Sequence, residues 1–234
     1  MSASDKTGAI ANSTKASAVD AFLDKAKAVP AVAARRGRLV FALDATMSRQ
    51  PTWDLALSLQ GKMFDVAASL GGLDVQLCYF RGFAECKASR FVSGGEGLAD
   101  LMSRIDVRGG TTQIQKVLHH VRGEAKALPV GALIFVGDAC EEYLDDLKPI
   151  AGELGLLGVK AFMFQEGRDA DVKHAFQTLA RLTGGAYAAF DASAPAKLAG
   201  LMKAAAAYAA GGRAALEREA KSEHDAAHLL SQMK

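Results

Sequence analysis

Leu39-Val-Phe-Ala-Leu-Asp44-Ala-Thr46-Met-Ser48 is the stretch of this sequence that decides the fold we expect. Its first five residues are continuously apolar, which is typical of a strand covered on both faces of a parallel sheet. Asp44, Thr46 and Ser48 then alternate with apolar residues, so their three oxygen-bearing side chains project roughly to one side. The stretch predicts a strand that gives way to a helix, and ligands of open α/β sheets bind where such strands end.

Two more segments carry oxygen-bearing side chains at comparable places. Gly109 and Gly110 permit a tight turn before Thr111, and Asp138 follows the apolar run 132–136. Taken alone, the first of these segments is more typical of a capped helix start, and many sheet strands end in an Asp. Taken together, they bring two carboxylates and three hydroxyls to one edge of a sheet, which suits a hard divalent cation. We therefore expect a metal-dependent binding module.

Strand and helix patterns alternate from residue 37 onward. They predict an α/β, Rossmann-like fold: an open, mostly parallel six-stranded sheet with helices on both faces and one antiparallel edge strand at 83–91. The expected strands are 39–43, 74–80, 83–91, 132–136, 159–164 and 186–190. The expected helices are 51–70, 98–105, 112–127, 143–154, 172–182 and 194–208.

The sequence divides into three parts. Residues 1–36 form a polar segment that we expect to be flexible, with a short amphipathic helix. Residues 37–208 form the domain. Residues 209–234 begin with a hinge at Gly211 and Gly212 and continue as a C-terminal helix, which packs on its own domain or on a partner.

Composition excludes several classes of function. The net charge of +2 gives no electrostatic case for nucleic acid or for an anionic membrane. The three cysteines have no Cys-x-x-Cys spacing and are expected to be reduced thiols. The sequence has neither a signal peptide nor a run of about 18 apolar residues, so we expect a cytoplasmic protein.

The order of these motifs resembles that of a bacterial cytoplasmic von Willebrand factor type A (VWA) domain with a metal-ion-dependent adhesion site (MIDAS). The family motif is Asp-x-Ser/Thr-x-Ser, then a Thr after a Gly-rich turn, then an Asp after the fourth strand. This sequence has Asp44, Thr46, Ser48, Thr111 and Asp138 at those places. The resemblance covers about residues 37–208.

The resemblance implies a chemistry for the site. Thr46, Ser48 and Thr111 would bind the ion directly or nearly so, and Asp44 and Asp138 would complete or orient the shell. The ion would be Mg²⁺, with Mn²⁺ as a substitute. A partner protein would fill the open position with an acidic side chain. The chain would then be no enzyme but an adaptor or assembly factor, of the kind that works beside AAA+ ATPases.

Two alternatives remain open from the sequence. Asp44 and Gly137-Asp138 also match a Mg²⁺-dependent phosphatase of the haloacid dehalogenase type, although Thr46 stands where that chemistry needs a second Asp. A structural scaffold with a degenerate metal site is the other alternative. Glu141 and Glu142 either favour the N-terminus of the next helix or reach the rim of the site.

Overall fold

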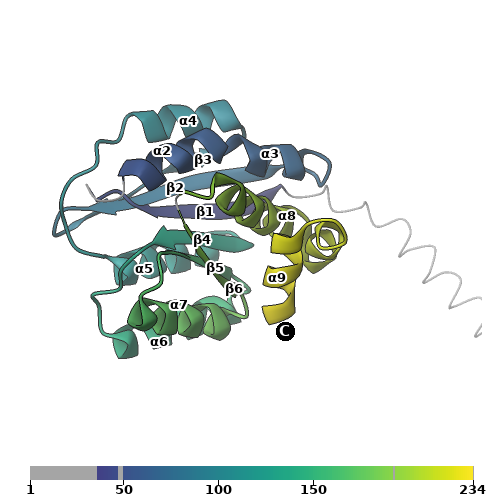
Figure 1. Ribbon diagram of the computed structural model, residues 1–234. Helices are drawn as coiled ribbons and strands as arrows, with labels where there is room; N and C mark the ends of the chain where they lie inside the picture. Colours follow the sequence, from purple (N-terminus) through teal and green to yellow (C-terminus); the bar gives the residue numbers. More distant parts are fainter. Residues whose placement is uncertain (1–35, 47–49, 192, 234) are drawn as a thin grey trace, which may run out of the picture. The chain divides into compact units, whose positions relative to one another are not determined.

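A single mixed sheet organises the computed structural model, which describes residues 36–46, 50–191 and 193–233 (Figure 1). Its strand order is β3-β2-β1-β4-β5-β6. The strands are parallel except for β3, which pairs antiparallel with β2 at one edge. The expected fold class and antiparallel edge strand are confirmed. The strands are β1 (Gly37–Asp44), β2 (Leu73–Arg81), β3 (Glu85–Val92), β4 (Ala132–Gly137), β5 (Lys160–Glu166) and β6 (Ala186–Phe190).

Helices connect these strands and cover both faces of the sheet (Figure 1). The helices of the described residues are α2 (Gln50–Leu59), α3 (Gly61–Ala68), α4 (Gly95–Ser103), α5 (Ile114–Ala127), α6 (Leu144–Leu156), α7 (Ala170–Thr183), α8 (Pro195–Glu219) and α9 (His224–Gln232). None of these helices is long and apolar enough to cross a membrane. The segment predicted at 1–36 to be flexible, with a short helix, lies outside the described residues up to residue 35.

Alternate residues of β1 supply the two halves of the core. Leu39, Phe41 and Leu43 pack with α2, α3, α4, α8 and α9 on one face. Val40 and Ala42 pack with α5, α6 and α7 on the other. This division follows from the two-residue period of a strand, and it explains why β1 is apolar at every position from 39 to 43.

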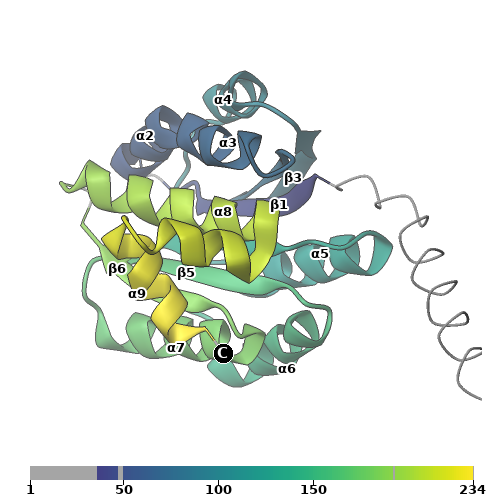
Figure 2. The ribbon, with the colours of Figure 1, turned by 90° about the vertical axis from the view of Figure 1, so that its right-hand side faces the viewer.

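Helix α8 lies directly against the sheet because the residues that meet there have small side chains or none (Figure 2). Its residues Ala204–Ala207 are buried. A Cβ atom added to Gly37 at the start of β1 would lie 2.2 Å from the carbonyl oxygen of Ala209. Gly37 is therefore required for the close approach of α8.

The structure differs from the sequence prediction in three helices. The helix expected at 51–70 is two helices, α2 and α3, which meet at Gln60 and Gly61. The helix expected from Thr112 begins at Ile114, with Gln113 as its N-cap residue. Gly211 and Gly212 do interrupt the helix with non-helical dihedral angles, but the segment beyond them is not one helix, since it breaks again between α8 and α9.

Candidate metal centre

Two of the predicted ligands lie at the carboxyl ends of neighbouring strands. Asp44 is the last residue of β1, and Asp138 directly follows the last residue of β4. The two strands are parallel, and Leu43 pairs in register with Val136. The backbone therefore brings both aspartates to the same edge of the sheet.

Asp44 and Thr46 form a tight local turn at the end of β1. The backbone N–H of Thr46 donates to Oδ1 of Asp44 at 2.8 Å. The two residues are 5% and 7% exposed, so this turn itself is buried. An aspartate that accepts from a backbone N–H two residues later is a common turn arrangement, and it fixes the orientation of the carboxylate. Ser48, the third residue of the predicted motif, lies outside the described residues.

The loop that carries Thr111 runs from α4 to α5 and is tied to this edge by its backbone (Figure 1). The N–H of Arg108 donates to the carbonyl oxygen of Ala45 at 3.0 Å, and the N–H of Thr111 donates to the carbonyl oxygen of Gly82 at 3.1 Å. A Cβ atom on Gly110 would lie 2.2 Å from that same oxygen of Gly82. The tight turn expected at Gly109 and Gly110 is absent, and neither glycine has a positive φ. Gly110 instead makes a close backbone-to-backbone contact with the β2–β3 turn.

Charged and polar side chains hold the β2–β3 turn against the same loop. The guanidinium of Arg81 donates to both carboxylate oxygens of Glu85, each at 3.0 Å, and also to the backbone carbonyl of Asp106. Arg81, followed by the Lys87 ammonium, lowers the pKa of Glu85 to about 2. The side-chain amide of Gln113 donates to the carbonyl oxygen of Arg81 at 3.2 Å. The loop and the turn thus form one hydrogen-bonded unit.

Glu141 and Glu142 serve a helix other than the one we expected. Both N–H groups at the start of α5, those of Ile114 and Gln115, donate to the Glu142 carboxylate at 2.8 Å. Glu141 and Thr112 exchange two hydrogen bonds, of 2.8 and 3.0 Å. The two glutamates therefore stabilise the N-terminus of the preceding helix α5, where a negative charge is favoured. The interpretation that they favour the following helix is wrong.

The sequence prediction missed a polar pair near this edge. The hydroxyl of Thr52, in the first turn of α2, donates to Oε2 of Glu166 at the end of β5. Thr52 is buried. Glu166 is the last residue of β5, as Asp44 is of β1, but Gln165 separates it from the apolar run of that strand.

The residue types at this edge suit a hard cation. Asp44, Thr46, Thr111 and Asp138 offer only oxygen atoms, which Mg²⁺ and Mn²⁺ prefer. Within the described ranges, no three His, Cys, Asp or Glu side chains converge as a metal site. A cation site with only two carboxylates, those of Asp44 and Asp138, would depend on hydroxyl oxygens for its other side-chain ligands.

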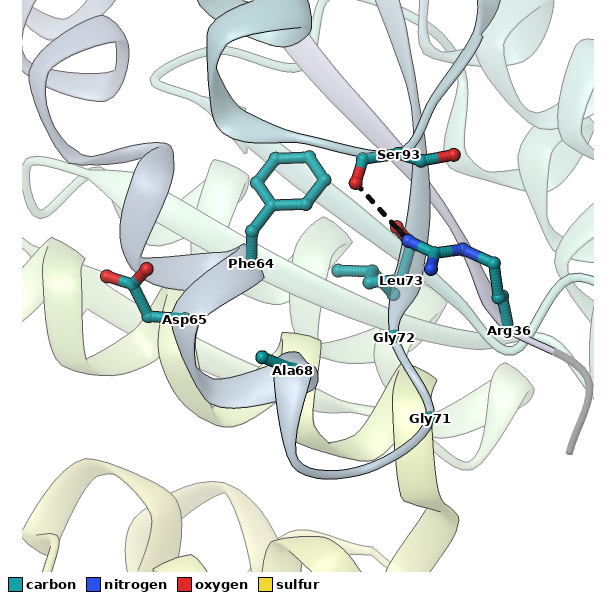
Figure 3. Close-up of a pocket in the computed structure, with 8 residues that line it drawn as sticks. All are labelled: Arg36, Phe64, Asp65, Ala68, Gly71, Gly72, Leu73 and Ser93. Carbon is teal, nitrogen blue, oxygen red and sulfur yellow. Dashed lines mark hydrogen bonds between the residues drawn. The ribbon is translucent and has the colours of Figure 1, made fainter.

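Two pockets lie away from the predicted ligands. The first pocket, of about 510 Å³, lies between α3 and the amino end of β2, whereas Asp44 lies at the carboxyl end of β1. Phe64 and Asp65 help to line it (Figure 3). Arg36 lies at its side and donates to the carbonyl oxygens of Leu73 and Ser93 at 2.9 and 3.2 Å. A smaller one, of about 280 Å³, lies at the carboxyl ends of β5 and β6. Neither pocket includes a predicted metal ligand.

Solved structures with a similar fold include VWA proteins. A von Willebrand factor type A protein from Catenulispora acidiphila matches with a TM-score of 0.61 and 13% identity, over 74% of this chain and 43% of that chain. The VWA domain of SpRpn10 matches with a TM-score of 0.53 and 10% identity, over 70% and 95%. Proximal thread matrix protein 1 from the mussel byssus matches with a TM-score of 0.56 and 15% identity, over 74% and 47%.

These likenesses show the fold alone, because the identities are low. The chain has the fold of VWA domains, and it spans less than half the length of the Catenulispora chain. No family model and no curated protein matches the sequence.

Proposed function

We propose that this chain is a protein-binding module that holds a divalent cation and uses it to recognise an acidic side chain of its partner. The observation that carries the proposal is the placement of Asp44 and Asp138 at the ends of neighbouring strands, with the Thr111 loop hydrogen-bonded to the residue after Asp44. Asp44, Thr46, Ser48, Thr111 and Asp138 would hold the ion. Mg²⁺ fits this donor set, with Mn²⁺ as a substitute. When bound, the ion would supply positive charge for a partner carboxylate.

Exposed aromatic side chains support a binding surface at this edge. Phe83 is 84% exposed and Tyr143 is 83% exposed. Phe83 follows Gly82, which contacts the Thr111 loop, and Tyr143 follows Glu142, which caps α5. Single exposed apolar residues are ordinary, so the support lies in their position on both sides of that loop. Aromatic residues are enriched where proteins bind one another.

Charge at the rim fits the same kind of partner. Arg108 is exposed, and its backbone is hydrogen-bonded to Ala45, next to Asp44. The positive charge of Arg108 would speed association with an acidic segment of the partner, and it would add specificity more than affinity. We propose that the chain acts as an adaptor or assembly factor. AAA+ ATPase systems are one class of protein partner to test.

We propose binding rather than phosphatase catalysis because of the residue two positions after Asp44. A phosphatase of the haloacid dehalogenase type needs a second carboxylate two residues after Asp44, and the chain has Thr46 there. Thr111 and the two glycines before it would also have no part in that chemistry.

Isothermal titration with Mg²⁺ and with Mn²⁺ tests the proposal directly. The wild-type chain should bind one ion, whereas Asp44→Asn and Thr111→Ala should each weaken binding by at least about tenfold, the equivalent of about 1.4 kcal/mol. Asp65→Ala is the matched control, because it removes an exposed carboxylate beside the pocket at the amino end of β2. If the wild type binds neither ion, or if Asp44→Asn binds as the wild type does, the metal-dependent function is wrong and the scaffold alternative gains support.

A further inference from the structure

Two cysteines lie diagonally across the antiparallel strands β2 and β3. Cys78 is in register with Ala88, and Cys86 is in register with Phe80. Residues two apart on a strand share a face, so both thiols project to the same face of the sheet, where α5 packs. Cys78 belongs to the apolar cluster on that face, and Cys86 packs against the same cluster.

Their surroundings give the two thiols different reactivity. Cys78 is fully buried, whereas Cys86 is only partly so. Lys116 of α5 donates from Nζ to the carbonyl oxygen of Ala84 at 2.8 Å, which keeps its ammonium group near Cys86.

The charges that face Cys86 favour its thiolate. The hydrogen bond from Cys78 and then the charge of Lys116 lower the pKa of Cys86, while burial and the Glu142 carboxylate oppose them. The same hydrogen bond and burial raise the pKa of Cys78. A partly exposed thiol with a lowered pKa beside a second cysteine is the arrangement found in thiols that react reversibly with oxidants.

We propose that Cys78 and Cys86 form a reversible disulfide when the protein meets hydrogen peroxide. The Cys86 thiolate attacks one peroxide oxygen and becomes a sulfenic acid, and the released hydroxide takes up a proton to give water. The sulfur of Cys78 then attacks the sulfur of Cys86, and the sulfenic hydroxyl leaves with the Cys78 proton as a second water. The two cysteines lose two electrons, which reduce the peroxide.

Strand β3 has the freedom that this bond requires. It is an edge strand, and its pairing with β2 is irregular between Gln76 and Cys78. Diagonal partners in an antiparallel pair have Cα atoms about 7–8 Å apart, and a disulfide needs about 4.4–6.8 Å. A small shift of β3 would bring the two Cα atoms within disulfide range. Such a shift is easier for an edge strand beside an irregular pairing, because a bulge adds local twist.

Cys140 provides a matched control. It lies after β4, and burial together with Glu142 raises its pKa to about 11, so it stays a thiol at neutral pH. Its replacement should leave the proposed disulfide intact.

The test treats the reduced full-length chain with hydrogen peroxide, blocks free thiols, and digests the protein with trypsin before mass spectrometry. Arg81 lies between the two cysteines, so trypsin separates them unless a disulfide joins the peptides. The wild type and Cys140→Ser should give the joined peptide, and dithiothreitol should release it. Cys86→Ser, a substitution at the more exposed thiol, should abolish it while leaving the circular dichroism spectrum unchanged.

Three results would overturn the proposal. One is a wild type that is oxidised at Cys86 alone with no joined peptide. Another is a disulfide that involves Cys140. The third is a joined peptide that disappears in Cys140→Ser. None of these results depends on metal binding, so the disulfide and the proposed function can fail separately.

Discussion

Gly110 shows how a single residue can position the candidate site. Its Cβ position is 2.2 Å from the backbone of Gly82, whereas that of Gly109 has nothing within 4 Å. We expect Gly110→Ala to lower the free energy of unfolding by about 1–3 kcal/mol, because the added methyl group pushes the loop away from the β2–β3 turn. Urea unfolding measures this effect.

Gly109→Ala is the control for that prediction, and it should leave the free energy of unfolding nearly unchanged. Gly110→Ala should also weaken Mg²⁺ binding, since Thr111 donates its N–H to Gly82. Equal stability of the two variants would mean that the loop yields easily and that the close contact does not matter.

The residues of the candidate site were predictable to different degrees. Asp44 and Asp138 are selected because each comes at the end of a strand after an apolar run, a purely local pattern. The contact between Thr52 and Glu166 joins residues on distant elements, so no local pattern predicts it. The same is true of Glu142, whose side chain reaches back to a helix that begins 28 residues earlier.

At the scale of elements, helix α5 depends on an acceptor from outside itself. Its N-cap residue Gln113 makes no side-chain capping bond, and Glu142 accepts from two of its first N–H groups instead. We expect Glu142→Ala to lower the free energy of unfolding by about 1–2 kcal/mol, because those N–H groups lose a charged partner at the positive end of the helix. Urea unfolding of the two proteins measures the difference.

A neighbouring acidic residue offers the comparison. Asp145 forms a surface ion pair with Lys148, and such pairs contribute little. Asp145→Ala should therefore unfold nearly as the wild type does. A Glu142→Ala variant as stable as Asp145→Ala would show that water replaces the carboxylate at no cost.

Strands were predicted better than helices, for a physical reason. Strands β1, β4 and β5 are buried on both faces, so their continuous apolar runs are unmistakable in the sequence. The apolar spacing that predicted one helix at 51–70 continues through the junction at Gln60 and Gly61, because both α2 and α3 face the same half of the core. The pattern therefore could not reveal the break.

At the scale of the whole sheet, β3 and β6 are the two edges, and a side chain covers part of the β6 edge. The side-chain amide of Gln232, at the end of α9, accepts from the N–H of Tyr187 at 3.0 Å and donates to its carbonyl oxygen at 2.8 Å. These are the hydrogen bonds that a further strand would make. The C-terminal helix thus packs on its own domain and satisfies backbone groups that would otherwise invite another chain.

We expect Gln232→Ala to lower the free energy of unfolding by about 1–3 kcal/mol, the net contribution of two hydrogen bonds. It should also increase self-association with protein concentration, because the freed groups of β6 can pair with a second copy. Urea unfolding and light scattering measure the two effects. Ser231→Ala is the matched control, since its hydroxyl donates only within α9, to the carbonyl oxygen of His228. If the two variants are equally stable and neither self-associates more than the wild type, the packing of Ala226 and Leu229, rather than the hydrogen bonds of Gln232, is what holds α9 against the domain.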